Sequence, residues 1–301
     1  MSNTKAWITA FRLRTLPLAF SGWLVGIAIA YTSTSINWLT ASLTLLTAFM
    51  LQILSNVAND YGDAVSGVDS EKREGPARMV QSGQISKPAM GKAVLVFSLI
   101  SLLLGCLLLY LAFPSEYPKA LVFLLIGVLA IVAAIKYTVG NNPYGYAGFG
   151  DLFVFIFFGV VLVFGTFYLQ AQTLDWPVLL PAASIGFLSI GVLNVNNIRD
   201  IESDKVSGKN SIPVRIGRER AVRYHVFLLF GALLFSAIFT LLSFVGWIQL
   251  IFLVVAVLFV KNIKAVAHRP LVELDPFLKQ MAIATLLFSL LFSFGLFAAS
   301  L

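Results

Sequence analysis

The sequence predicts an all-α integral membrane protein, in which nine transmembrane helices form one membrane-embedded domain over residues 1–301. Composition is the first reason, because 59% of the residues are hydrophobic and only 12% are charged, whereas soluble domains carry about 25% charged residues. The second reason is that apolar runs long enough to cross about 30 Å of hydrocarbon recur along the whole chain. These observations exclude a soluble enzyme, a nucleic-acid-binding domain and a disordered chain. The single cysteine, Cys106, excludes a disulfide framework.

The expected spans follow one another with short polar connections. The region before the first span has no compact apolar segment ending in small residues, so this span is interpreted as permanent and not as a cleaved signal peptide. The fourth and eighth runs are short or end in lysine, but each is still long enough to cross the hydrocarbon at 1.5 Å per residue. In chain order the nine runs are 16–33, 37–58, 93–113, 119–137, 152–172, 177–198, 221–243, 246–264 and 278–300.

The basic residues predict the orientation of these spans. If the N-terminus is inside and the crossings alternate, 20 of the 21 Lys and Arg residues fall in inside segments, and only Lys119 falls outside. This distribution predicts an N-in, C-out topology in the cell membrane. The net charge of +7 is therefore a topology signal and does not require a nucleic-acid partner. His225 and His268 lie near helix ends and are interpreted as interfacial.

Eight of the 14 acidic residues lie in two clusters, one after the second span and one after the sixth. Acidic groups at the end of a span are costly and indicate function. The first cluster also holds the amides Gln52, Asn56 and Asn59. Within the clusters, side chains spaced by three or four residues form one helical face each. The two faces consist of Asn56, Asp60 and Asp63, and of Asn196, Asp200 and Asp204.

The two clusters resemble each other in sequence. NVANDYGD after the second span is similar to NVNNIRDIESD after the sixth, which predicts two parallel four-helix repeats with the ninth helix added. Because four crossings separate the clusters, both are expected on the cytoplasmic side of the membrane.

Clusters of hard oxygen ligands suit Mg²⁺, which proteins bind with one or two carboxylates together with substrate phosphates. Basic residues follow each cluster, and this combination is expected around a diphosphate. A secondary transporter would also contain repeats and intramembrane acids, but it favours inverted repeats and sites near the midplane. A CDP-alcohol phosphatidyltransferase would have one aspartate cluster on fewer spans. The basic residues concerned are Lys72, Arg73 and Arg78, and Lys205, Lys209 and Arg215.

With these motifs on nine spans, the chain resembles the UbiA-type intramembrane prenyltransferases, in the menaquinone-pathway branch that prenylates a dihydroxynaphthoate. The common family motif N-D-x-x-D-x-x-x-D departs here after Asp63, which leaves open whether Asp69 or Glu71 is the third ligand. The role of Lys136, before the Y-T-V-G motif, is also open. The matching stretches are RTLPLA at 14–19, QILSNVANDYGD at 52–63, GPARMVQSG at 75–83, YTVG at 137–140, PYGYAGFGD at 143–151, NNIRDIESDK at 196–205, GKN at 208–210 and VRIG at 214–217.

The resemblance implies a Mg²⁺-dependent transfer of a polyprenyl group from an allylic diphosphate to a dihydroxynaphthoate-type acid, with loss of CO₂ and diphosphate. Prenylation of 4-hydroxybenzoate or another acceptor is the alternative. Membrane lipid is expected around the protein, and no protein partner is indicated. Phenylalanines such as Phe153, Phe157 and Phe158 are candidates to face the allylic cation.

Roles for individual residues follow from the same resemblance. The diphosphate would be bound by Arg73, Arg78 and Lys209. The acceptor would be oriented by Arg14, Tyr144 and Tyr146, and Asp151 would accept its phenolic proton, although Asp151 also suits helix capping. The implied metal ligands, of which the four aspartates are also implied catalytic residues, are Asn56, Asp60, Asp63, Asn197, Asp200 and Asp204.

Overall fold

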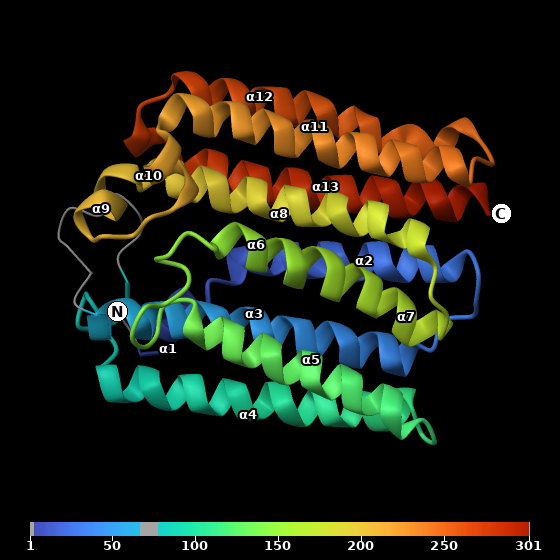
Figure 1. The fold of residues 1–301 in the computed structure, drawn as a ribbon, viewed down its shortest axis with the longest axis horizontal. Coiled ribbons are helices and arrows are strands. Elements are labelled where there is room, and N and C mark those ends of the chain that lie inside the picture. The colour runs from blue at the N-terminus through green and yellow to red at the C-terminus, as the bar shows by residue number, and fades with distance from the viewer. Residues whose placement is uncertain (1–2, 67–77, 301) are drawn as a thin grey trace.

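The computed structural model describes residues 3–66 and 78–300, and these residues form helices and no strand (Figure 1). Nine helical segments of this part of the chain are long and apolar enough to cross a membrane, which confirms the expected fold class. The elements before and within the first half are α1 (Asn3–Phe11), η1 (Leu13–Thr15), α2 (Leu16–Tyr31), α3 (Trp38–Ser66), α4 (Lys87–Ala112) and α5 (Tyr117–Lys136).

The second half begins with a span of three joined pieces, the middle one a π-helix. The further elements are α6 (Gly150–Val154), η2 (Phe155–Phe164), α7 (Gly165–Ala171), η3 (Trp176–Val178), α8 (Leu179–Arg199), α9 (Ile201–Val206), α10 (Ile212–Ile216), α11 (Arg218–Leu242), η4 (Trp247–Val255), α12 (Ala256–His268), η5 (Leu271–Glu273) and α13 (Asp275–Ala299).

Helix pairings repeat between the two halves of the bundle. In the first half α3 packs along α4, and in the second half α8 packs along α11. The last helix, α13, contacts α2, α8 and η4, so it joins the two halves. These pairings agree with the duplication that the two motifs predict.

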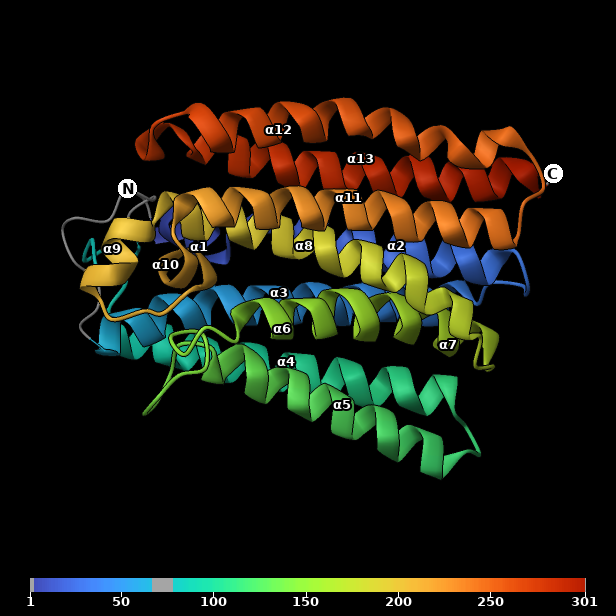
Figure 2. The same ribbon diagram turned by 45° about the horizontal axis from the view of Figure 1, so that its top comes forward.

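The two termini lie at opposite ends of the bundle, as an odd number of crossings requires (Figures 1 and 2). The N-terminus, α9, α10 and the loop 137–149 lie together at one end, which we call the polar end. The turns after α2, α4 and α7 lie at the other end with the C-terminus. Both acidic motifs therefore reach the same end of the molecule, as their spacing along the chain predicts.

Helix α3 ends at Ser66, eight residues beyond the apolar run that ends at 58. Asn56, Asp60 and Asp63 therefore lie on one helix, as their spacing predicts. The helix continues through this polar stretch because both carboxylates are buried and have hydrogen-bond partners from the following segments. The run of apolar residues ends earlier, at 58, because polar residues follow it in the sequence.

Buried apolar side chains form a large cluster in α2, α8, α11 and α13, and smaller clusters at the two ends of the first half. His225 lies in this interior. It is 0% exposed, and its Nε2 lies 2.9 Å from Oδ1 of Asn262. The interpretation of His225 as interfacial is wrong, because its ring is buried inside the bundle against Asn262 of α12.

Candidate functional site

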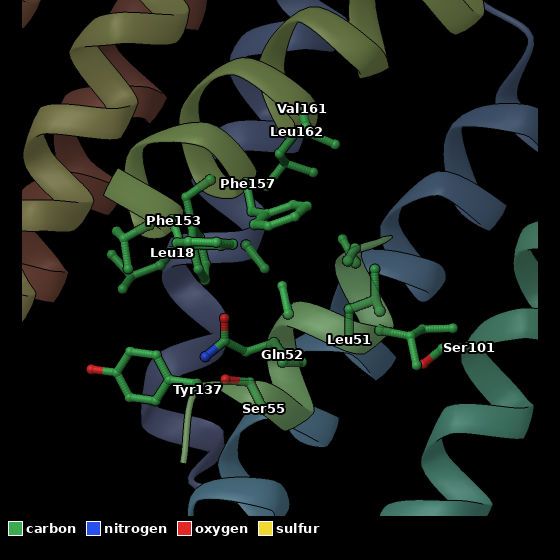
Figure 3. Close-up of a pocket in the computed structure, with 18 of the residues that line it drawn as sticks. Leu18, Leu51, Gln52, Ser55, Ser101, Tyr137, Phe153, Phe157, Val161 and Leu162 are labelled. Atoms are coloured by element: carbon green, nitrogen blue, oxygen red, sulfur yellow. The ribbon is translucent and has the colours of Figure 1, made fainter. Parts of the chain in front are cut away.

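A cavity of about 410 Å³ extends from the polar end into the bundle between α2, α3, α4, α5 and the span formed by α6, η2 and α7 (Figure 3). Along this last span, residues that line the cavity recur every four positions, at Phe153, Phe157, Val161, Gly165 and Leu169. A π-helix has more than 3.6 residues per turn, so residues four positions apart in η2 stay on the side of the helix that faces the cavity. Turns of π-helix are frequent at functional sites. The cavity thus combines an apolar, aromatic wall with a polar end.

The first motif is held in place by residues 78–80. Asp63 forms an ion pair with Arg78, and its Oδ1 accepts a hydrogen bond of 2.6 Å from the hydroxyl of Tyr146. Asp60 accepts hydrogen bonds from the backbone N–H groups of Met79, at 3.0 Å, and Val80, at 3.3 Å. Both carboxylates are buried, so these partners replace the water that the charges lose. Their orientation is therefore fixed by the protein.

Tyr146 reaches Asp63 because the loop 137–149 docks on the second half of the chain. The backbone N–H of Asn210 donates to the carbonyl of Tyr146 at 2.8 Å. Gly148 has φ +79°, and a Cβ there would lie 2.5 Å from the carbonyl oxygen of Asn210, so this close approach requires glycine. Burial first, and then the charge of Asp63, raises the pKa of Tyr146. The phenol therefore stays protonated and donates to the carboxylate.

The second motif ends in a buried carboxylate with a cationic neighbour. Asp204 lies 3.3 Å from Nζ of Lys209 and accepts a 3.3 Å hydrogen bond from Ser211. Burial raises the pKa of Asp204, and Lys209 opposes this rise. Burial acts to lower the pKa of Lys209, but the acidic groups around it, Asp204 first and Asp63 and Asp200 also, raise it. Lys209 thus lies within electrostatic reach of both motifs.

Asp200 belongs to a chain of ion pairs that links three helices. Arg199 donates from Nε and Nη2 to the two oxygens of Asp200, each at 2.8 Å, and from Nη1 to Asp275 at 2.6 Å. The other oxygen of Asp275 lies 3.7 Å from Arg14. Arg199 is nearly fully buried, so its charge is balanced by these two carboxylates. The chain connects the second motif to Arg14 at the start of the first span.

The cavity brings together seven of the predicted site residues: Arg14, Asn56, Asp63, Arg78, Tyr144, Tyr146 and Lys209. Five others are buried near it but do not line it: Asp60, Asp151, Asn197, Asp200 and Asp204. The carboxylate of Asp151 accepts a 3.0 Å hydrogen bond from Tyr224 of α11. Arg73, Asp69 and Glu71 lie outside the described residues, as do Lys72 and Glu74.

The donor set of this site fits Mg²⁺. It consists of oxygens alone, and the side-chain oxygen of Asn197 is buried without a hydrogen-bond partner among the described residues. In residues 3–66 and 78–300 no three acidic, His or Cys side chains converge to enclose an ion. Asp60 keeps capacity for a further bond because a carboxylate has about four lone-pair sites.

Sequence reasoning assigned no role to Arg12, Thr15, Gln52 and Tyr137, which also line the cavity. Gln52 belongs to the first cluster, and its position one helical turn before Asn56 is the feature of the sequence that could have assigned it to the site. Arg12 adopts a left-handed conformation, φ 48°, that turns the chain between α1 and η1. No spacing rule in the sequence predicts such a turn.

Comparisons with known proteins by family, by sequence and by structure agree with one another. Residues 19–286 match the family model described as the UbiA prenyltransferase family. The chain is 44% identical over 298 residues to 1,4-dihydroxy-2-naphthoate octaprenyltransferase of Escherichia coli K12, covering 99% of this chain and 96% of that one. It shares its fold with a UbiA homolog from Aeropyrum pernix K1, with a TM-score of 0.67 at 17% identity, covering 96% and 97% of the two chains. A UbiA homolog from Archaeoglobus fulgidus bound to GPP and Mg²⁺ has a TM-score of 0.58 at 18% identity, covering 96% of this chain and 99% of that one.

Proposed function

Because the chain belongs to the UbiA prenyltransferase family, we propose that it transfers a polyprenyl group from an allylic diphosphate to 1,4-dihydroxy-2-naphthoate. The observation that carries this proposal is one cavity with Arg78 and Lys209 at its polar end and an aromatic, apolar wall beyond them. Such a cavity suits a ligand with an anionic head and a hydrocarbon tail. The naphthoate acceptor is supported by the name of the relative that is 44% identical.

In the proposed reaction the bond between the allylic carbon and the diphosphate oxygen breaks, and diphosphate leaves with the electron pair. Ring electrons of the acceptor form the new C–C bond at the carbon that carries the carboxylate. The bond to the carboxylate then breaks, CO₂ leaves, and its electron pair restores the aromatic ring. Atoms and charges balance without net proton transfer, so the scheme assigns no step to Asp151.

Arg78 and Lys209 bind the diphosphate oxygens through charge-assisted hydrogen bonds, which are stronger than neutral ones. Bound Mg²⁺ supplies further positive charge to the leaving diphosphate. The residues that would hold it are Asn56, Asp60 and Asp63 on α3, with Asn197, Asp200 and Asp204 of the second motif. Phe153, Phe157 and Phe158 exclude water and present ring faces, which favour a developing cation.

The proposed location is the cell membrane, with the N-terminus and the polar end on the cytoplasmic side. The distribution of Lys and Arg supports this orientation, because 20 of the 21 fall in segments expected on the inside. The exception, Lys119, lies next to the turn after α4, at the other end of the bundle (Figure 1). A membrane-impermeant thiol reagent tests it in a Cys106→Ala background. Ser207→Cys should react only from the cytoplasmic face and Ser115→Cys only from the other, and the reverse pattern contradicts the orientation.

The activity is tested with purified protein, farnesyl or geranylgeranyl diphosphate, and either 1,4-dihydroxy-2-naphthoate or 4-hydroxybenzoate, with Mg²⁺ or with excess EDTA. We expect prenylated naphthol with Mg²⁺ and none with EDTA. A preference for 4-hydroxybenzoate would overturn the acceptor assignment, and product that persists in EDTA would overturn the metal assignment.

A further inference from the structure

We propose that Gln52 is an acceptor-binding residue whose amide oxygen accepts a hydrogen bond from a ring hydroxyl of the acceptor. This inference rests on the proposed function and adds a residue to it. Gln52 is on α3, is 9% exposed and lines the cavity. In Figure 3 its side chain lies at the lower edge of the cavity, between Tyr137 and Ser55.

The orientation of the Gln52 amide follows from the hydrogen bonds of Thr15. The Thr15 hydroxyl donates its one hydrogen to the carbonyl of Arg12 at 2.9 Å, so it has only acceptor capacity left. It accepts hydrogen bonds of 3.0 Å from Nε2 of Gln52 and Nδ2 of Asn56. Nδ2 of Asn56 also donates to the carbonyl of Phe11 at 3.0 Å. Both amide nitrogens are therefore directed to the start of α2, and both amide oxygens face the other way.

The amide oxygen of Gln52 is buried and has no hydrogen-bond partner among the described residues. A buried acceptor without a partner is unfavourable, and a ligand that donates a hydrogen bond there removes that penalty. The group that meets this oxygen must therefore carry an O–H or N–H. A polar group held in one orientation and left unpaired is how a site selects ligands that carry the complementary hydroxyl.

Of the polyprenyl diphosphate, the acceptor and Mg²⁺, only the acceptor has such a group. The prenyl chain has no donor, and the ionised oxygens of a diphosphate accept hydrogen bonds. A cation held by the carboxylates of Asp60 and Asp63 lies further along α3, because these residues are eight and eleven positions from Gln52, about 12 and 16.5 Å at 1.5 Å per residue. Asn56 is one turn from Gln52, but its amide nitrogen is directed to Thr15 and Phe11. The two ring hydroxyls of a dihydroxynaphthoate are thus the matching donors.

The test is the equilibrium affinity of wild type and Gln52→Leu for 1,4-dihydroxy-2-naphthoate, 1-hydroxy-2-naphthoate and 4-hydroxy-2-naphthoate. Diphosphate and Mg²⁺ replace the prenyl donor, so that differences in ring reactivity do not enter. Wild type should bind the dihydroxy acid about 2- to 13-fold more tightly than one of the two monohydroxy acids, the range of one neutral hydrogen bond. In Gln52→Leu this difference should disappear, while the affinity for diphosphate stays unchanged.

Gln172→Leu is the matched control. The amide oxygen of Gln172 is likewise buried without a partner among the described residues, but Gln172 does not line the cavity, so discrimination should persist. If Gln52→Leu does not fold, Thr15→Val serves instead, because it releases the amide and should reduce the same discrimination. The inference is overturned if Gln52→Leu binds the dihydroxy acid as wild type does, or if it weakens all three acids equally. Wild type that binds 4-hydroxybenzoate and no naphthoate would instead refute the proposed function.

Discussion

Replacing Tyr146 by Phe removes one hydroxyl that donates to Asp63 and changes little else. That hydrogen bond is 2.6 Å long and its acceptor is a buried carboxylate. Hydrogen bonds to charged groups contribute about 1.5–3 kcal/mol, which corresponds to roughly 10- to 150-fold in an equilibrium or rate at 1.36 kcal/mol per factor of ten. Arg78 still pairs with the carboxylate, so we expect the loss in kcat/KM to stay within this range and the Mg²⁺ concentration for half-maximal rate to rise.

The assay is the initial rate of prenyl transfer over a series of Mg²⁺ concentrations, normalised to folded protein. Tyr224→Phe is the matched control, since Tyr224 donates to the buried carboxylate of Asp151 at 3.0 Å, outside the cavity lining. It should keep a rate within about twofold of wild type. A Tyr146→Phe rate within twofold of wild type, or an equal loss in both variants, would refute the role given to Asp63.

Three further outcomes follow from the same site. Asp60→Asn and Asp200→Asn should each lower turnover by about 100-fold or more, with an unchanged elution volume in size-exclusion chromatography; near-normal turnover in either would contradict its role. Asp275→Asn should lower the free energy of unfolding by about 1 kcal/mol, because Asp275 is partly exposed although its partner Arg199 is buried; thermal unfolding in detergent measures this. Gly127 lines the cavity, and a Cβ there meets nothing within 4 Å, so Gly127→Leu should reduce the rate with geranylgeranyl diphosphate more than with geranyl diphosphate, and an equal effect on both would contradict this reading.

Much of the fold could be predicted from the sequence because hydrocarbon imposes a simple length requirement on each span. The nine spans and the approach of the two motifs to one end of the bundle followed from apolar runs and from counting crossings. The end of α3 did not, because polar residues such as Asp60 continue a helix only when tertiary partners bury them. His225 was misplaced for the same reason, since its burial depends on a neighbouring helix.

The candidate site was predictable only in part. Spacing placed Asn56, Asp60 and Asp63 on one face, but it could not show that Tyr146 donates to Asp63 from 83 residues away. That contact depends on the docking of the loop 137–149 against Asn210. The pairing of Arg199 with Asp275, 76 residues away, is similarly long-range. Hydrogen-bond geometry, which decides the role of Gln52, has no counterpart in the one-dimensional pattern.

The most direct test of the proposed reaction is its stoichiometry with carboxyl-labelled 1,4-dihydroxy-2-naphthoate. Labelled CO₂, diphosphate and prenylated naphthol are measured together in single preparations of the purified protein with Mg²⁺ and a polyprenyl diphosphate. The three products should appear in equal amounts, and none should appear in excess EDTA. Prenylated product that keeps the carboxyl label, or CO₂ released without prenyl transfer, would contradict it.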